Sequence, residues 1–277
     1  MTSSSPASAK PAKLSLLPDE LAAIKPMPAL GLVAPFDFRL DAECWRWLPP
    51  QTSLYVTRTS RVEDETVTVE LAQAVSEGED VARAVDSLVA NDPQAIAYAC
   101  TSGSFVGGVA GERKLCQAML DAGAPAAVTP SGAMVEALHH LGAKRVAVAT
   151  PYIESLTTLL AEFLQEAGFE VVSNGYLDKD SEIFNVSYEA VKYLAATVDR
   201  PDADAIFFSC TNMRTFDIIE ELEQALGKPV LSANQVTMWA ALRAANLPLP
   251  KLNQRLFSEP KLQYSTDTLL EPGKVLH

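Results

Sequence analysis

Short apolar runs alternate with longer amphipathic segments along most of the chain, and this alternation restricts the fold more than any other feature. Such runs, rich in valine, alanine and isoleucine, are typical of strands that are buried on both faces. Strands that alternate with helices form parallel sheets covered by helices, so we predict an α/β protein. The predicted strands cover residues 30–35, 54–59, 95–100, 126–129, 145–150, 170–173, 205–210 and 229–232. Gly142, Gly168 and Gly227 stand where a left-handed glycine commonly ends a helix.

Three short motifs occur twice in the same order. The pairs are LVAPF at 32–36 and VATPY at 148–152, ACT at 99–101 and SCT at 209–211, and MxxAL at 134–138 and 238–242. A repeat of this length predicts two related lobes. We expect the lobes to span residues 29–142 and 143–250, with a mobile tail over 1–28 and a C-terminal extension over 251–277.

The charge balance argues against several classes of partner. The chain has 22 Lys and Arg against 35 Asp and Glu, a net charge of −13, which disfavours nucleic acid and anionic membrane surfaces. No signal peptide and no apolar run of about 18 residues is found, so we expect a cytoplasmic protein with no membrane span. The 4 cysteines contain no C-x-x-C pair and glycine-rich phosphate motifs are lacking, so we expect neither a metal nor a cofactor.

Two cysteines, Cys100 and Cys210, end predicted strands at equivalent points of the repeat. Ligands of parallel sheets bind at the carboxyl ends of strands. We expect each thiol to stand just before a helix, whose positive end would lower the thiol pKa toward neutrality. On facing lobes, two such thiols would reach one ligand from opposite sides. The alternative is that both cysteines are buried for packing, but their repeated placement favours catalysis.

Hydroxyl and amide side chains follow both cysteines directly. They are Thr101 and Ser102 in the first lobe and Thr211 and Asn212 in the second. Turns of this kind hold anions through side-chain and backbone donors, which predicts a small carboxylic acid as the ligand. Ordinary helix capping explains the same residues without any ligand.

The motifs ACTSGSF (99–105), KRVAVATPYI (144–153) and SCTN (209–212) together resemble the aspartate/glutamate racemase superfamily. Within it, the chain is most similar to the branch of maleate cis-trans isomerases and arylmalonate decarboxylases, which includes ectoine-utilisation proteins. The likeness extends over about residues 29–247. It implies two pseudo-symmetric lobes, each a four-stranded parallel sheet flanked by helices. It also implies a site in the cleft between the lobes, no metal or organic cofactor, and a dimer or larger homo-oligomer.

The resemblance also assigns roles to single residues. Cys210 corresponds to the cysteine that these enzymes share, and Cys100 to a cysteine that the decarboxylases replace with glycine. Thr101, Ser102 and Tyr152 correspond to hydroxyl groups that hold a carboxylate.

This chain departs from the maleate isomerases at two points. They carry an asparagine after the first strand and another in the loop after the sixth, where this chain has PFDF (35–38) and KDSE (179–182). An aspartate there would repel a ligand carboxylate. Our leading hypothesis is a cofactor-independent isomerase or racemase of a small carboxylic acid that uses Cys100 and Cys210. The alternatives are an arylmalonate-type decarboxylase using Cys210 alone, which the presence of Cys100 disfavours, and a non-catalytic carboxylate-binding protein.

Overall fold

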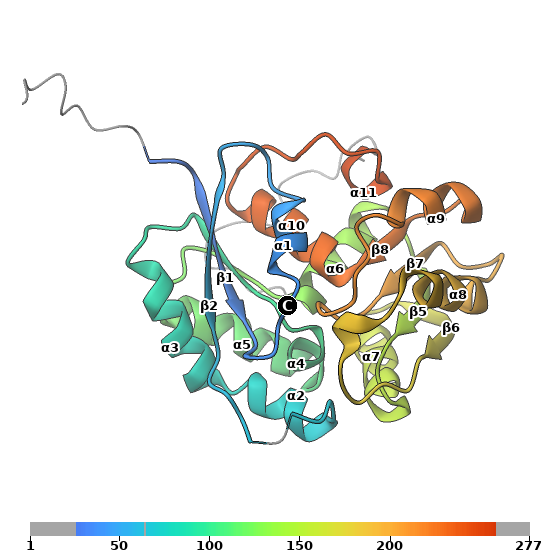
Figure 1. Cartoon of the computed structure of the whole chain (residues 1–277), viewed down its shortest axis with the longest axis horizontal. Helices are drawn as coiled ribbons and strands as arrows, with labels where there is room; N and C mark the ends of the chain where they lie inside the picture. The colour runs from blue at the N-terminus through green and yellow to red at the C-terminus, as the bar shows by residue number, and fades with distance from the viewer. Residues whose placement is uncertain (1–25, 64, 259–277) are drawn as a thin grey trace, which may run out of the picture.

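Two parallel sheets form the centre of the molecule (Figure 1). The computed structural model describes residues 26–63 and 65–258. The first sheet contains β1 (Ala29–Ala34), β2 (Ser53–Arg58), β3 (Ala95–Tyr98) and β4 (Ala127–Val128). The second contains β5 (Arg145–Thr150), β6 (Glu170–Tyr176), β7 (Ala205–Phe208) and β8 (Val230–Ser232). All the expected strands are present, and the predicted α/β class is confirmed.

The two sheets have the same topology. Their strand orders are β2-β1-β3-β4 and β6-β5-β7-β8, and every neighbouring pair is parallel. The order follows the sequence repeat, because β1 and β5 carry the first motif and the two cysteines follow β3 and β7. The predicted pair of pseudo-symmetric sheets is therefore confirmed. Most of the predicted tail over 1–28 and of the extension over 251–277 lies outside the described residues.

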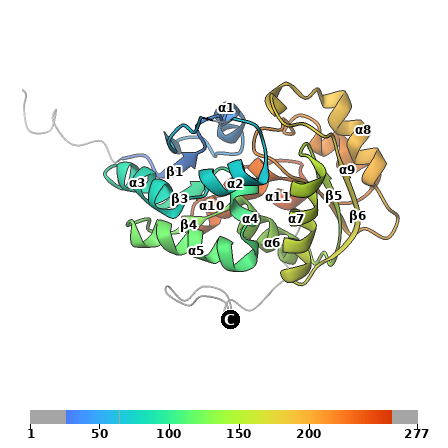
Figure 2. The same ribbon diagram turned by 90° about the horizontal axis from the view of Figure 1, so that it is seen from below.

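Helices connect the strands and cover the sheets. In the first half they are α1 (Asp41–Trp45), α2 (Val69–Val75), α3 (Gly78–Val89), α4 (Thr101–Phe105), α5 (Gly108–Asp121) and α6 (Pro130–His140). In the second half they are α7 (Glu154–Glu166), the 3-10 turn η1 (Ile183–Asn185), α8 (Tyr188–Val198), α9 (Ile219–Leu226), α10 (Ala233–Ala244) and α11 (Arg255–Ser258). Seen from below, α3 covers the first sheet and α8 the second (Figure 2). Across the described part of the chain, no helix has both the length and the apolar character that a bilayer span requires.

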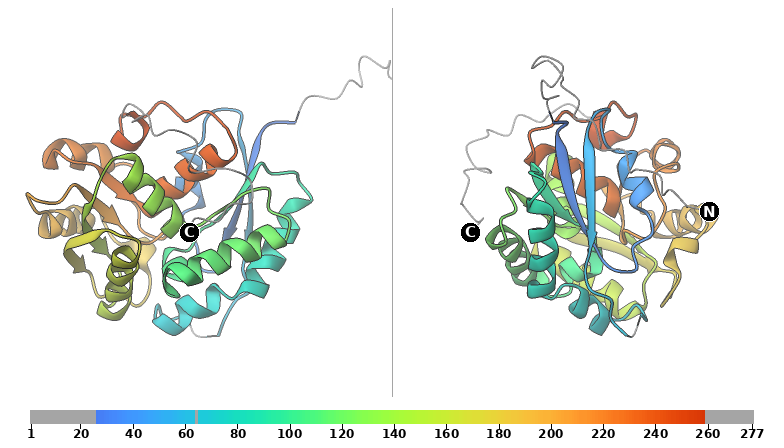
Figure 3. Two further views of the ribbon diagram at one scale, coloured as in Figure 1. Left: turned by 180° about the vertical axis from the view of Figure 1, so that it is seen from behind. Right: turned by 60° about the vertical axis from the view of Figure 1, so that its left-hand side comes forward.

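Helices α6 and α10 lie beside each other in the middle of the molecule (Figures 1 and 3). Helix α10 follows β8 of the second sheet, yet it also packs against β3 and β4 of the first. Almost every side chain of α10 is buried, as expected for a helix that is enclosed on all sides. One continuous apolar cluster therefore includes residues of both sheets, and this cluster fixes the two lobes relative to each other.

The strands that precede the cysteines end earlier than predicted. β3 ends at Tyr98 and β7 at Phe208, so each cysteine lies just beyond its strand. Cys100 is the N-cap of α4, and Cys210 has a φ of 97°, a left-handed conformation that no strand contains. The predicted helix-ending glycines are confirmed, because all three have φ between 70° and 91°.

Candidate active site

Cys100 lies at the carboxyl end of β3 and is only 8% exposed. Its Sγ is 3.6 Å from the hydroxyl oxygen of Ser102. Burial raises the pKa of the Cys100 thiol, although the backbone N–H of Gly103 and the hydroxyls of Ser102 and Tyr98 act in the opposite direction. The expected lowering of this pKa is wrong, because the loss of solvation outweighs the donors at the start of α4.

Cys210 occupies the corresponding position after β7. Burial raises its pKa to about 12, against the stabilising effect of the Asn212 backbone N–H and the Tyr152 hydroxyl. A turn-rich segment follows Cys210, and the next helix, α9, begins only at Ile219. The expectation of a helix directly after Cys210, and of a lowered pKa, is therefore wrong for this residue as well.

The two cysteines belong to one site although they come from different lobes. The negative charge of the Cys100 thiolate is one of the influences that raise the pKa of Cys210. Each of the two thiolates also raises the pKa of the Tyr152 hydroxyl, which indicates that Tyr152 lies close to both cysteines. Such mutual effects require short distances through a medium of low dielectric constant.

Three hydroxyl residues lie beside the cysteines, in the sequence or in space. The Thr101 hydroxyl is buried and has no hydrogen-bond partner among the described residues. The Ser102 hydroxyl faces Cys100, and the Tyr152 hydroxyl accepts a hydrogen bond from Ser209 at 3.3 Å. A buried hydroxyl without a partner is costly, and a ligand oxygen would supply one. This arrangement suits a carboxylate.

Thr211 and Asn212, in contrast, are engaged across the lobes. The Thr211 hydroxyl donates to the carbonyl oxygen of Ala99 at 2.8 Å. The Asn212 side chain accepts from the backbone N–H of Arg39 at 2.9 Å and donates to the carbonyl oxygen of Asp37 at 3.3 Å. Both predicted ligand contacts therefore hold the turn after β7 against the first lobe in this structure.

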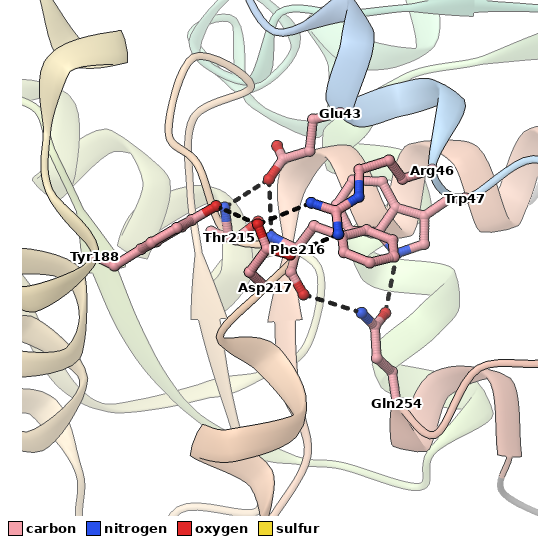
Figure 4. A network of polar contacts seen from close by, with 8 residues as sticks. All are labelled: Glu43, Arg46, Trp47, Tyr188, Thr215, Phe216, Asp217 and Gln254. Carbon is pink, nitrogen blue, oxygen red and sulfur yellow. Dashed lines mark hydrogen bonds and ion pairs between the residues drawn. The ribbon is translucent and has the colours of Figure 1, made fainter.

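A buried carboxylate fixes the rest of the Cys210 turn (Figure 4). Glu43 of α1 accepts hydrogen bonds from the backbone N–H groups of Thr215 at 2.7 Å and Phe216 at 2.8 Å. Its second oxygen accepts from the amide of Asn234 at 2.8 Å, and the same amide donates to the carbonyl oxygen of Thr211 at 2.8 Å. Burial raises the pKa of Glu43. From sequence, Glu43 looks like an ordinary acidic residue in the first turn of a helix, so this role was not predicted.

More polar contacts surround this carboxylate (Figure 4). Arg46 forms an ion pair with Asp217, which also accepts from the Tyr188 hydroxyl at 2.7 Å. The indole N–H of Trp47 donates to Gln254 at 2.9 Å, which ties the segment before α11 to the same face. Segments of three distant parts of the chain thus meet around the turn that follows β7.

The loops after β2 and β6 also meet. The backbone N–H of Val67 donates to the carbonyl oxygen of Asp180 at 2.7 Å. The Arg39 guanidinium lies over the Phe184 ring, 4.2 Å from its centroid. Each lobe therefore contributes loops that hold the other at the carboxyl edges of the sheets.

The fold and this site define a two-lobed α/β protein in which each lobe contributes a cysteine to one buried site. More specifically, the chain belongs to the arylmalonate decarboxylase family, which matches residues 66–257. It is 32% identical over 160 residues to the maleate isomerase of Pseudomonas putida, covering 55% of this chain and 64% of that protein. It is 37% identical over 153 residues to the arylmalonate decarboxylase of Bordetella bronchiseptica, covering 52% of this chain and 62% of that one. These matches span less than two thirds of either relative.

Solved structures of both kinds share the fold. The maleate isomerase Iso of Pseudomonas putida S16, as a cysteine-to-alanine variant with maleate, gives a TM-score of 0.75 at 25% identity over 85% of this chain and 99% of that chain. A Nocardia farcinica maleate cis-trans isomerase variant with a covalently bound succinylcysteine intermediate gives 0.76 at 27% identity, covering 84% and 99%. An arylmalonate decarboxylase variant in a liganded form gives 0.76 at 29% identity, covering 84% and 100%. The predicted resemblance to this branch is confirmed.

Proposed function

We propose that this protein is a cofactor-independent isomerase of a small carboxylic acid, most like maleate cis-trans isomerase. The observation that carries the proposal is the pairing of Cys100 with Cys210 in one buried site built by both lobes. The similarity to maleate isomerases, one of them with a succinylcysteine intermediate, supports sulfur addition as the chemistry. The free state of all 4 cysteines supports a reducing compartment such as the cytoplasm.

The surroundings of the two thiols differ, and this difference suggests which cysteine is the nucleophile and which is the acid. Burial raises the pKa of both thiols, but Ser102 and the backbone N–H of Gly103 offset part of this effect at Cys100, so we assign Cys100 as the nucleophile. Cys210 holds its proton more firmly, with a pKa of about 12, so we assign it as the acid. The hydroxyls of Thr101 and Tyr152 would bind the carboxylate beside the reacting carbons.

The steps then balance without a co-reactant. The thiolate of Cys100 adds to one carbon of the double bond and forms a carbon–sulfur bond. The π electrons move to the neighbouring carbon, which takes the proton of Cys210. Charge that spreads onto the adjacent carboxylate is stabilised by the buried hydroxyls. After rotation about the new single bond, the Cys210 thiolate removes a proton, the carbon–sulfur bond breaks, and the trans acid forms.

Proton NMR in deuterium oxide tests this proposal. Wild-type protein is incubated with maleate and a panel of related unsaturated acids, beside Cys100→Ser and Cys210→Ser. We expect new trans-olefin signals from the wild type, and turnover lower by about 10²- to 10⁴-fold in either variant. Cys116→Ser is the control, because Cys116 lies on α5 and bonds to Glu112 outside the site. Wild-type turnover in either site variant would overturn the two-thiol mechanism.

The same samples separate the other hypotheses. Exchange of an α-proton without a change in a double bond would indicate a racemase. Carbon dioxide release from malonates that survives Cys100→Gly would indicate a decarboxylase that uses Cys210 alone. Ligand-induced shifts in melting temperature without product or deuterium uptake would indicate a non-catalytic carboxylate-binding protein.

A further inference from the structure

Asp37 lies in the turn after β1, at the same edge of the first sheet as Cys100. The Asn212 side chain holds this turn from the other lobe. Its amide nitrogen is 3.3 Å from the carbonyl oxygen of Asp37 and 3.5 Å from the carboxylate, and its oxygen accepts from the backbone N–H of Arg39. Because Asn212 follows Cys210 closely, one side chain fixes the turn that carries Asp37 relative to the second cysteine.

The carboxylate of Asp37 forms no ion pair with any residue that the structure describes. The nearby arginines are directed elsewhere: Arg58 donates to two carbonyl oxygens of the same turn, and Arg39 stacks on Phe184. Burial and the charge of Glu65 raise the pKa of Asp37, while Arg58 and Arg39 lower it. The site therefore contains a carboxylate whose charge is only partly compensated.

This charge reaches both thiols. The negative charge of Asp37 raises the pKa of Cys100 and of Cys210, and Asn212, two residues after Cys210, holds the Asp37 turn beside the second lobe. The unpartnered hydroxyl of Thr101 already suits one ligand carboxylate. A second ligand carboxylate would meet the like charge of Asp37 in a medium of low dielectric constant, whereas an N–H donor would form a charge-assisted hydrogen bond with it.

We propose that Asp37 makes this site specific for acids that carry an N–H donor, as an amide or an ammonium group, where maleate carries its second carboxylate. This proposal rests on the proposed function and adds the class of substrate to it. It also accounts for an acidic residue in a site that otherwise suits an anion, because one end of the ligand would be held by hydroxyls and the other by a carboxylate.

The first test compares maleate with its monoamide, maleamate, which has the same carbon skeleton. The ratio of the two kcat/KM values is measured by NMR for the wild type, Asp37→Asn and Asp92→Asn. We expect the wild type to favour maleamate by about 10²-fold, and Asp37→Asn to shift the ratio toward maleate by at least about tenfold. Asp92→Asn removes one charge from an exposed position before β3, at the end of that strand opposite to Cys100, and should keep the wild-type ratio.

The second test measures binding alone, so that it does not depend on turnover. Titration calorimetry compares succinate, succinamate and 4-aminobutanoate, which differ at one end only. We expect the wild type to bind succinate at least about tenfold more weakly than the better of the other two, and that ligand identifies the donor as an amide or an ammonium group. Asp37→Asn should remove most of this difference.

The outcomes separate this proposal from the proposed function. Equal affinity of the wild type for all three ligands, or an unchanged ratio in folded Asp37→Asn, would overturn the role of Asp37 even if isomerisation is observed. Selective binding of an N–H donor without isomerisation of any acid would uphold Asp37 and overturn the isomerase. Should Asp37→Asn fail to give a cooperative melting transition, the wild-type affinities still decide the question.

Discussion

Replacement of Glu43 with alanine should loosen the turn that carries Cys210. Glu43 accepts three hydrogen bonds, from the N–H groups of Thr215 and Phe216 and the amide of Asn234. These contacts join α1 to the segment after β7, which is distant in the sequence. Glu43 is thus a positioning residue, and the expected effect is on the geometry of the second cysteine.

The magnitude follows from the partners that would be left unpaired. Each buried donor that loses its acceptor costs about 1–3 kcal/mol, so three donors sum to as much as roughly 3–9 kcal/mol. Removal of the carboxylate offsets part of this loss of stability, because burial disfavours the charged form of Glu43. We expect Glu43→Ala to lower the free energy of unfolding by about 3 kcal/mol. In Glu43→Gln, the remaining oxygen still accepts from the two backbone donors, but the new amide group faces the amide of Asn234, which is also a donor. We therefore expect a smaller loss, about 1 kcal/mol, in the free energy of unfolding.

Urea denaturation followed by circular dichroism measures these differences. The matched control is Asp41→Ala, since Asp41 lies in the same helix and forms no hydrogen bond or ion pair that joins the lobes among the described residues. Alkylation of Cys210 should also become faster in Glu43→Ala, because the loosened turn admits solvent. An unfolding midpoint equal to that of the wild type, with unchanged alkylation, would refute the reasoning.

Three further predictions concern burial. Burial raises the pKa of Glu223 from 4.5 to about 7, so the folded protein binds a proton that the unfolded chain releases. The contribution of Glu223 to the free energy of unfolding is fully present below about pH 4.5 and falls by roughly 3 kcal/mol as the pH rises to about 7. Denaturation curves measured at several pH values should show this slope for the wild type but not for Glu223→Gln. Gly103→Ala would put a Cβ 2.6 Å from the Tyr98 hydroxyl, so we expect a loss of about 1–3 kcal/mol in urea denaturation, and Tyr98→Phe in the same chain should recover part of it. Finally, Cys100 and Cys210 should react slowly with iodoacetamide at pH 7 and faster at higher pH, and rapid labelling at pH 7 in peptide mass spectrometry would contradict their burial.

The strands and their division into two related lobes could be predicted because that information is local. A strand buried on both faces is a short apolar run, and the repeat places equivalent strands at equivalent points of two sheets. The placement of both cysteines at carboxyl edges followed from the same pattern. The pattern could not locate the last residue of each strand. Cys210, for example, has a left-handed backbone conformation that no feature of the local sequence indicates.

The contacts between the lobes could not be predicted in the same way. Asn212 and Arg39 are hydrogen-bonded although they are 173 positions apart, and Glu43 and Thr215 although they are 172 positions apart. The error about the thiol pKa values has the same origin. The local sequence reveals the donors at the start of α4, whereas the solvation of Cys100 depends on all the residues that the fold packs around it.

The repeat itself explains why two equivalent cysteines need not do equivalent work. The residue two positions before the cysteine is Tyr98 in the first lobe and Phe208 in the second. The equivalent residues after β1 and β5 are Phe36 and Tyr152. Each lobe therefore supplies one tyrosine, but at different points. The Tyr98 hydroxyl donates to the carbonyl oxygen of Val75 at 2.8 Å within the first lobe, whereas the Tyr152 hydroxyl lies close to both thiols. In the reaction that we propose, this symmetric pair of sheets would present a ligand with two chemically different sides, as one nucleophile and one acid require.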